Sequence, residues 1–303
     1  MRRSVLGVVR AGLLVLVSTA ASAEMLECGQ QPVDVSRIAV AGGSLTEILY
    51  DLGMAGQIVA VDRTSNYPEA ALELPQIGYV RNISAEGLLS LEPTFVLGEH
   101  DMGPPEVIEQ LSNLGVDMLL VPEAFSAAGI EAKIACVATA VGVPEKGNDL
   151  AASVVAGVVS EHEGTAAAGD ATLSRGIVLL GLRSGAPVAA GANTSGDGLL
   201  TMAGAENLFD FEGWKPVSVE SMAAASPEFI VIPNRGIEMA GGMDALLDHP
   251  ALRLTPAARD RRVIAMDGMA MLGFGPRTVR AAADLRRLLQ TEVLSVEKVA
   301  SVP

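Results

Sequence analysis

IGYVRNISAEGLLSLEPTFVLG, residues 77–98, joins a loop, the start of a helix and a buried strand in one run. Ser84 is typical of a helix N-cap, and Pro93 precedes the apolar strand. A second stretch, VSVESMAAASPEFIVI at 217–232, repeats this order with identical residues at four places: Ser84/Ser218, Glu86/Glu220, Pro93/Pro227 and Phe95/Phe229. Two matched βα units predict two matched α/β lobes, and two lobes predict a ligand cleft between them.

The composition is that of a folded protein with a substantial core. The chain has 303 residues, of which 50% are hydrophobic and 19% charged, enough for one large domain or two ordinary ones. The formal charge is −15 and no basic stripe is present to neutralise phosphates, so nucleic acid is excluded as a partner. The histidine and cysteine spacings match no familiar zinc site.

Residues 1–23 have the layout of a cleaved secretory signal. Arg2 and Arg3 precede a short apolar run, which ends in the small residues at 21–23. The run is too short to span a bilayer, so we expect an exported chain that begins near Glu24. Loss of Arg2, Arg3 and Arg10 would take the formal charge from −15 to −18.

The two cysteines, Cys28 and Cys136, could pair in an oxidising compartment. They lie far apart in sequence, and Cys28 falls in an expected tail, so we expect two free or buried thiols. Glu27 stands before Cys28, where lipid-anchored precursors carry a small residue, which disfavours a lipoprotein.

Hydrophobic periodicity divides the rest into a first lobe at 37–143, a helix at 144–168 and a second lobe at 174–300. The connecting helix, at about 1.5 Å per residue, is long enough to reach from one lobe to the other. In the second lobe we expect a strand at 176–180, a loop at 181–195 and another loop at 233–242. Loops after strands, such as 62–68 and 99–105, lie where open α/β sheets bind ligands.

A turn of Gly42, Gly43 and Ser44 follows the first strand of this scheme. Its N–H groups would suit an anion at a helix N-terminus, although simple βα geometry is the more usual reason for such a turn. A distant alternative is a secreted α/β serine hydrolase with Ser44 or Ser84 as nucleophile. The chain lacks a Gly-x-Ser-x-Gly elbow, which disfavours that enzyme.

Six stretches together resemble the haem-binding periplasmic proteins of bacterial haem-uptake ABC transporters, which are class III substrate-binding proteins: GGSLTEILYDLG, LPQIGYVRNISAEGLLSLEP, GPPEVIEQL, VAAGANTSGDGLL, KPVSVESM and MLGFGPRT. The similarity covers residues 37–290. It implies two Rossmann-like α/β lobes joined by a single long α-helix, with the ligand between them. It also implies a monomeric periplasmic carrier, not an enzyme, that delivers haem to an inner-membrane permease and its ATPase.

The resemblance implies that Tyr79 is the axial ligand of a ferric haem and that Arg81 is its partner. On the residues alone, a tyrosine in a Gly-Tyr loop is more often one that covers the edge of a lobe. Free tyrosine has a pKa of about 10, but bound iron favours the phenolate, a hard anionic ligand. Arg81, two residues on in an extended segment, is on the same side and could donate to it. Gly78 has no side chain to block a flat macrocycle.

The two haem propionates require cations. Arg235, after the strand at 229–232, is our principal candidate, because relatives place an arginine near it; a solvated loop arginine is the alternative. Arg63 and Arg183 are weaker candidates.

Some relatives carry a histidine in the loop that here reads GLRSG at 181–185. Its absence favours one haem per chain, with five-coordinate or weakly six-coordinate iron. His100 could substitute, but a hydrogen-bonded structural histidine is the more usual reading. We expect Met269 and Met271 to line the pocket without binding iron, since a thioether prefers a softer metal.

Glu86 and Glu220 each follow a capping serine by two residues. A carboxylate in the first turn of a helix is stabilised by about 0.3–1 kcal/mol, which is reason enough for either one. Their occurrence in both lobes matches the family's use of one glutamate per lobe to dock on permease arginines. The alternative ligand for the same fold is cobalamin or a ferric siderophore, against which Tyr79 would only stack or hydrogen-bond.

Overall fold

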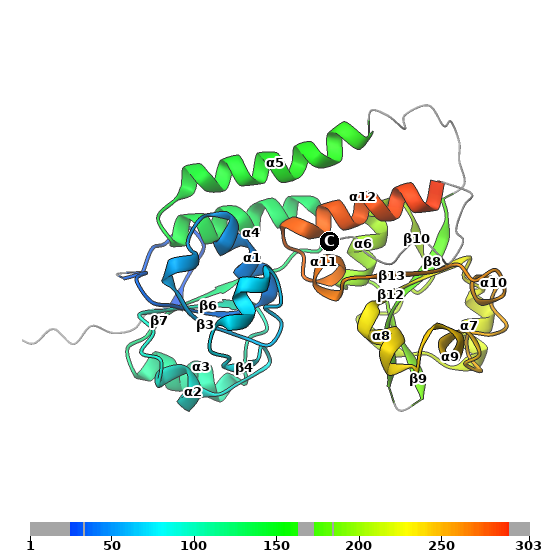
Figure 1. Cartoon of the computed structure of the whole chain (residues 1–303), viewed down its shortest axis with the longest axis horizontal. Helices are drawn as coiled ribbons and strands as arrows, with labels where there is room; N and C mark the ends of the chain where they lie inside the picture. Colours follow the sequence, from blue (N-terminus) through cyan, green and yellow to red (C-terminus); the bar gives the residue numbers. More distant parts are fainter. Residues whose placement is uncertain (1–24, 33, 163–172, 184, 291–303) are drawn as a thin grey trace, which may run out of the picture.

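The computed structural model describes residues 25–32, 34–162, 173–183 and 185–290. These residues form two lobes, each a β-sheet flanked by helices (Figure 1). We call the half that precedes helix α5 the N-lobe and the half that follows it the C-lobe. The predicted fold class, two α/β lobes with a long helix, is confirmed.

The N-lobe sheet is parallel throughout, with strand order β1-β7-β6-β2-β3. Its strands are β1 (Met25–Leu26), β2 (Ile38–Ala41), β3 (Ile58–Val61), β6 (Phe95–Glu99) and β7 (Asp117–Val121). In β2, Ile38 and Val40 belong to one apolar core and Ala39 and Ala41 to another. This alternation buries both faces, as expected for a parallel sheet covered by helices on each side.

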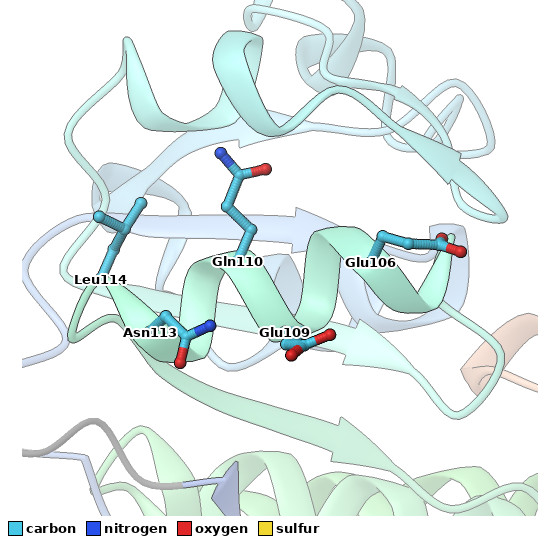
Figure 2. A pocket seen from close by; sticks show the side chains of 5 residues that line it. All are labelled: Glu106, Glu109, Gln110, Asn113 and Leu114. Atoms are coloured by element: carbon cyan, nitrogen blue, oxygen red, sulfur yellow. The ribbon is translucent and has the colours of Figure 1, made fainter.

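Helices cover both faces of the N-lobe sheet. One face packs on α1 (Gly43–Asp51) and α4 (Ala127–Ala140), and the other on α2 (Ala85–Leu89) and α3 (Pro105–Asn113). A shallow depression on α3, shown in Figure 2, is lined by Glu106, Glu109, Gln110, Asn113 and Leu114. All five come from this helix and its C-terminal end, so the depression does not involve the C-lobe.

The C-lobe sheet has the order β11-β9-β8-β12-β13, and β10 also pairs with β8. Its strands are β8 (Arg175–Arg183), β9 (Ala186–Ala190), β10 (Glu206–Asn207), β11 (Trp214–Pro216), β12 (Phe229–Pro233) and β13 (Val263–Met266). One face packs on α6 (Ser195–Ala203), α11 (Gly268–Leu272) and α12 (Pro276–Gln290). The other packs on α7 (Val219–Ala225), α8 (Asn234–Met239), α9 (Met243–Leu247) and α10 (Pro256–Arg259).

Two predicted loops of the C-lobe are partly regular structure. The expected loop 181–195 contains the end of β8 and all of β9, which pair as an antiparallel hairpin. Gly185, with φ of 80°, supplies the left-handed conformation near its turn. The expected loop 233–242 contains α8, which follows β12 directly.

Helix α5 (Pro144–His162) lies along the side of the molecule that α4 and α12 share (Figure 1). It packs against both, so it contacts one helix from each lobe. The predicted residues 163–168 of the connecting helix lie outside the described residues, as do the expected signal at 1–23 and the end of the second lobe.

The strand ends of the N-lobe that carry the predicted ligand loops face the C-lobe. Phe274, just before α12, is wholly buried in the N-lobe core and meets Phe125 edge to face at 5.1 Å between centroids. Gly43, at the start of α1, lies so close to Met269 that an added Cβ would stand 2.6 Å from its methyl carbon. The two lobes are therefore packed directly against each other where Phe274 meets Phe125 and Met269 meets Gly43.

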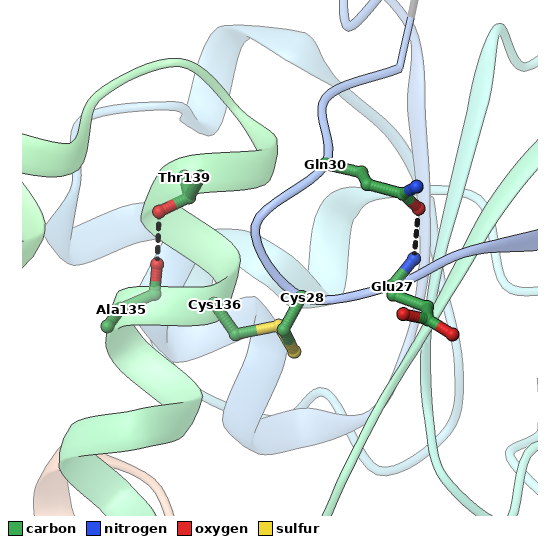
Figure 3. Close-up of a disulfide and its surroundings, with 6 residues drawn as sticks. All are labelled: Glu27, Cys28, Gln30, Ala135, Cys136 and Thr139. Atoms are coloured by element: carbon green, nitrogen blue, oxygen red, sulfur yellow. Dashed lines mark hydrogen bonds between the residues drawn. A yellow bond between two sulfur atoms is a disulfide. The ribbon is translucent and has the colours of Figure 1, made fainter.

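The prediction of two free thiols is wrong, because Cys28 and Cys136 form a disulfide (Figure 3). The N-terminal segment is not a detached tail: β1 pairs with β7, which carries Cys28 to the side of α4. The Cα atoms of the two cysteines are 4.9 Å apart, a normal separation for a disulfide.

Within the described part of the chain, no helix is both long enough and apolar enough to cross a membrane.

Candidate functional site

Tyr79 lies in a tight two-stranded hairpin formed by β4 (Gly78–Tyr79) and β5 (Asn82–Ile83). Gly78 has φ of 113°, and a Cβ there would stand 2.7 Å from the carbonyl oxygen of Asn82. The hairpin therefore requires glycine at this position for its own geometry, independently of the prediction that a side chain here would block a flat macrocycle. Tyr79 is 39% exposed.

Asp62 anchors this hairpin to the end of β3. Its carboxylate is wholly buried and accepts hydrogen bonds from the backbone N–H of Val80 at 3.1 Å and of Gly42 at 3.0 Å. The N–H of Arg63 also donates to the carbonyl of Gly78, at 2.8 Å. Buried charge-assisted bonds of this kind are stronger than neutral ones, so the backbone beneath Tyr79 is held from the strand end.

Arg81 lies in the two-residue turn of the hairpin and reaches back over Tyr79. Its Nη1 donates to the phenol oxygen of Tyr79, and its Nη2 pairs with the carboxylate of Asp101. Its guanidinium carbon is 5.7 Å from the ring centroid, within the range of a cation–π contact. Burial acts against its charge, but Asp101 and Tyr79 more than offset this and raise the pKa of Arg81.

The contact between Arg81 and Tyr79 that spacing indicated is present, although its geometry differs from the prediction. We expected an extended segment to carry both side chains on one side. Instead Val80 and Arg81 form the turn between two short strands, and the chain reverses there. Chemically, the pair is an exposed phenol oxygen with a cationic hydrogen-bond donor beside it, and an oxygen ligand of this kind suits a hard metal ion.

Arg235 lies on α8, directly after β12, in the other lobe. In Figure 1, α8 lies on the side of the C-lobe that is turned toward β4 of the N-lobe. Arg235 is exposed, and no hydrogen bond or ion pair joins it to any other described residue. The structure therefore does not bring it into contact with Tyr79 or Arg81, and leaves its guanidinium open to a ligand.

Glu86 and Glu220 occupy equivalent, exposed positions at the first turns of α2 and α7. The caps match: Ser84 accepts from an N–H three residues on at 3.1 Å, and Ser218 does so at 3.1 Å. Backbone and Ser218 hydrogen bonds hold the pKa of Glu220 below its usual value. Neither carboxylate forms an ion pair with a described residue.

The remaining candidates divide into exposed and buried residues. Arg63 and His100 are exposed, and the side chain of Arg183 lies outside the described residues. Met269 is half-buried beside Gly43 and Gly273. The prediction that Met271 lines a pocket is wrong, because Met271 is wholly buried in the C-lobe core between the sheet and α12.

A buried polar cluster, which the sequence analysis missed, joins the lobes around Lys133. The Lys133 ammonium lies 2.5 Å from Glu123, 3.4 Å from Glu99 and 3.4 Å from the C-lobe carbonyl of Gly273. It also donates to Ser44 at 3.1 Å, while the Ser44 hydroxyl donates to Glu99 at 2.5 Å. Ser44 is only 1% exposed, which argues against the serine-nucleophile alternative.

Glu99, His100 and Glu123 place potential metal ligand atoms within 4.8 Å of one another. The Lys133 ammonium already lies against both of the carboxylates. Burial raises the pKa of Glu123; Lys133 opposes this shift and Glu99 adds to it. A lysine at this place supplies the positive charge that a metal ion would bring, so we assign the cluster a structural role.

A second polar contact between lobes centres on Arg277, at the start of α12. Arg277 pairs with Glu47 of α1 at 2.5 Å and with Asp267 at 3.2 Å, and stacks on the ring of Tyr67 at 4.0 Å. Burial raises the pKa of Glu47, which Arg277 partly opposes. For the first cluster the sequence signal was a lysine in a helix of mostly apolar or small residues. Arg277 begins an arginine-rich helix and gave no such signal.

Comparison with known proteins identifies relatives over most of the chain. The model of the family described as "Periplasmic binding protein" matches residues 38–270. The periplasmic haem-binding protein RhuT of Roseiflexus sp. RS-1 is 37% identical, with a TM-score of 0.79, over 84% of this chain and 97% of that one. The periplasmic haem-binding protein HutB of Vibrio cholerae is 31% identical, with a TM-score of 0.75, over 85% and 100%. The vitamin B12-binding protein of Pectobacterium carotovorum is 27% identical over 62% of this chain and 67% of that protein.

Proposed function

Because the chain belongs to the periplasmic binding protein family, we propose that it binds ferric haem in the periplasm and carries it to an inner-membrane ABC permease. The observation that carries this proposal is Tyr79, an exposed phenol whose oxygen accepts a hydrogen bond from Arg81. The similarity to haem-binding proteins at 37% and 31% identity supports it. The chain would act as a carrier, exported by the signal at 1–23, monomeric and without catalysis.

In this proposal the phenolate of Tyr79 binds the ferric iron, and the other residues of the site contact either the phenolate or the haem. Arg81 stabilises the phenolate through its hydrogen bond. Arg235, exposed on the facing side of the C-lobe and without a described partner, binds a haem propionate. Met269 lies near the facing sides of the lobes and lines the pocket, whereas Met271 is buried in the C-lobe core.

Delivery would use Glu86 and Glu220, one from each lobe, as the contacts for arginines on the permease dimer. Their support is the matched local structure: each is exposed in the first turn of a serine-capped helix. The permease's ATPase would supply the energy for transport.

A titration with hemin at neutral pH tests the proposal. We expect a Soret band with a tyrosinate-to-iron charge-transfer band, saturating at one haem per chain. Tyr79→Phe removes only the ligand oxygen, so it should abolish the charge-transfer band and weaken binding at least about tenfold, which corresponds to 1.4 kcal/mol. Tyr50→Phe is the matched control, since Tyr50 packs on the N-lobe core near the C-terminal end of α1, and it should leave the spectrum unchanged. Equal spectra for the wild type and Tyr79→Phe would refute the ligand assignment.

Cobalamin is the second candidate, favoured by the similarity to vitamin B12-binding proteins at 27% identity. Cobalamin carries its own cobalt ligands, so Tyr79 would bind it only by stacking or hydrogen bonding. Equilibrium dialysis with cyanocobalamin separates the two: micromolar or tighter binding of cobalamin, with no Soret change on addition of hemin, would favour the B12 carrier.

A further inference from the structure

Arg81 uses both of its terminal amino groups, and only one of them contacts Tyr79. Nη1 donates to the phenol oxygen, while Nη2 pairs with Asp101. The side chain of Arg81 is 58% exposed, so packing alone does not fix it. If a single exposed hydrogen bond held Arg81, the loss of side-chain entropy of this long residue would offset much of its benefit.

Asp101 is well placed to remove that freedom. It lies in the turn between β6 and α3, and its side chain is 26% exposed, less than that of Arg81. Two backbone hydrogen bonds join this turn to the Tyr79 hairpin: Gly103 donates to Val80 at 2.9 Å, and Ile83 donates to Gly103 at 2.8 Å. The carboxylate and the hairpin therefore belong to one rigid unit.

We infer that Asp101 is a positioning residue for the ligand of the haem iron, because it holds Arg81 in the orientation that donates to Tyr79. The inference rests on the proposed haem-binding function. Asp101 does not touch the iron and acts only through Arg81. By its hydrogen bond, the guanidinium draws electron density from the phenolate and so weakens its donation to the iron. Asp101 keeps this hydrogen bond in place, and in this way it affects the iron–phenolate bond without touching either partner.

The spectroscopic consequence has a definite sign. Loss of the hydrogen bond makes the phenolate a better donor, which raises its filled orbital and moves the tyrosinate-to-iron band to longer wavelength. Arg81→Ala should show this shift in full. Asp101→Ala should shift the band in the same direction by a smaller amount. Hemin should also dissociate about twofold to fivefold faster, because the guanidinium and the phenol are no longer held in place, and loss of an exposed ion pair changes a rate by about this much. Asp101→Asn, which keeps an oxygen acceptor without the charge, should lie between Asp101→Ala and the wild type.

A double-mutant cycle separates positioning from a general effect of charge or folding. In the Arg81→Ala background, Asp101→Ala should produce no further shift and no further change in release. Asp244→Ala is the matched control, since it breaks the exposed pair with Arg261 at 2.8 Å in the C-lobe and should leave the band unchanged. Thermal melts of the apo variants verify that each one folds.

The outcomes distinguish the two levels of the argument. If Asp101→Ala has a wild-type band and release rate, or if its effect persists undiminished without Arg81, the positioning role is refuted while the haem site stands. If Tyr79→Phe also retains the wild-type spectrum, the haem site and the positioning role fall together.

Discussion

Lys133→Met should lower the free energy of unfolding by about 3–5 kcal/mol, the usual cost of removing one partner from a buried ion pair. The ammonium side chain is 0% exposed, and its carboxylate partners Glu123 and Glu99 are only 9% and 13% exposed. At separations of 2.5 and 3.4 Å, with an effective dielectric of about 20, the two attractions are about 7 and 5 kcal/mol. In the intact protein, the cost of removing the three charged groups from water offsets most of these two attractions. After the substitution, both carboxylates remain in the lobe junction without a cation.

Urea denaturation followed by far-ultraviolet circular dichroism measures the effect. With a slope of about 2–3 kcal/mol/M, the midpoint should fall by about 1–2.5 M. Lys133→Met combined with Glu123→Gln removes one of the two stranded charges and should recover a substantial part of the loss. Arg261→Ala is the control: it breaks an exposed pair with Asp244, which is worth at most about 1 kcal/mol.

A midpoint for Lys133→Met that matches the Arg261→Ala control would refute this account of the junction. So would a double variant that is no more stable than Lys133→Met alone, because the cost would then not arise from the unpaired carboxylate of Glu123. Such results would mean that apolar packing around Phe274, and not the polar cluster, holds the lobes together.

Three further predictions concern other parts of the chain. Replacing Cys28 and Cys136 by serine should cost about 3–5 kcal/mol in denaturation experiments, because the disulfide closes a loop with a sequence separation of 108 residues; an unchanged midpoint would contradict this. Burial raises the pKa of Glu123 above its usual value, so the folded state binds this proton more tightly than the unfolded state. The wild type should therefore gain stability relative to Glu123→Gln as the pH falls from 7 toward 5, and a relative loss would contradict the sign. Glu86→Ala and Glu220→Ala should reduce haem delivery to permease-containing vesicles while leaving hemin affinity unchanged, and undiminished delivery by the double variant would exclude docking through these residues.

Features with a local cause could be predicted from the sequence. The repeated serine caps are an example: each depends only on an oxygen and an N–H three residues away, and the structure has both at the same distance. The contact between Tyr79 and Arg81 is also local, so the two-residue spacing was enough to predict it, although the turn that produces it was not. The alternation of Ile38, Ala39, Val40 and Ala41 between two cores likewise follows from strand periodicity.

Features that depend on distant segments could not be predicted in this way. Cys28 meets Cys136 because a two-residue strand joins the far edge of the sheet, and two residues carry no periodic signal. The segment 181–195 was predicted as one loop, yet Gly181, Leu182 and Arg183 end β8 and pair with residues of β9. Lys133 stands in a helix whose other residues are mostly apolar or small, and only the fold shows which carboxylates it meets.

The candidate site combines both kinds of information, since a locally encoded pair is oriented by residues from two other loops. Asp62, directly after β3, holds the hairpin backbone, and Asp101, two residues after β6, holds the guanidinium of Arg81. Both carboxylates come from carboxyl ends of parallel strands, which meet at one edge of the sheet. The sequence analysis placed Asp62 and Asp101 in loops where ligands bind but gave neither a role, because neither would touch the ligand. An acidic residue just after a buried strand is therefore a signal of a positioning residue when a candidate ligand loop follows a neighbouring strand. The sheet brings the two together, because the carboxyl ends of parallel strands lie at the same edge.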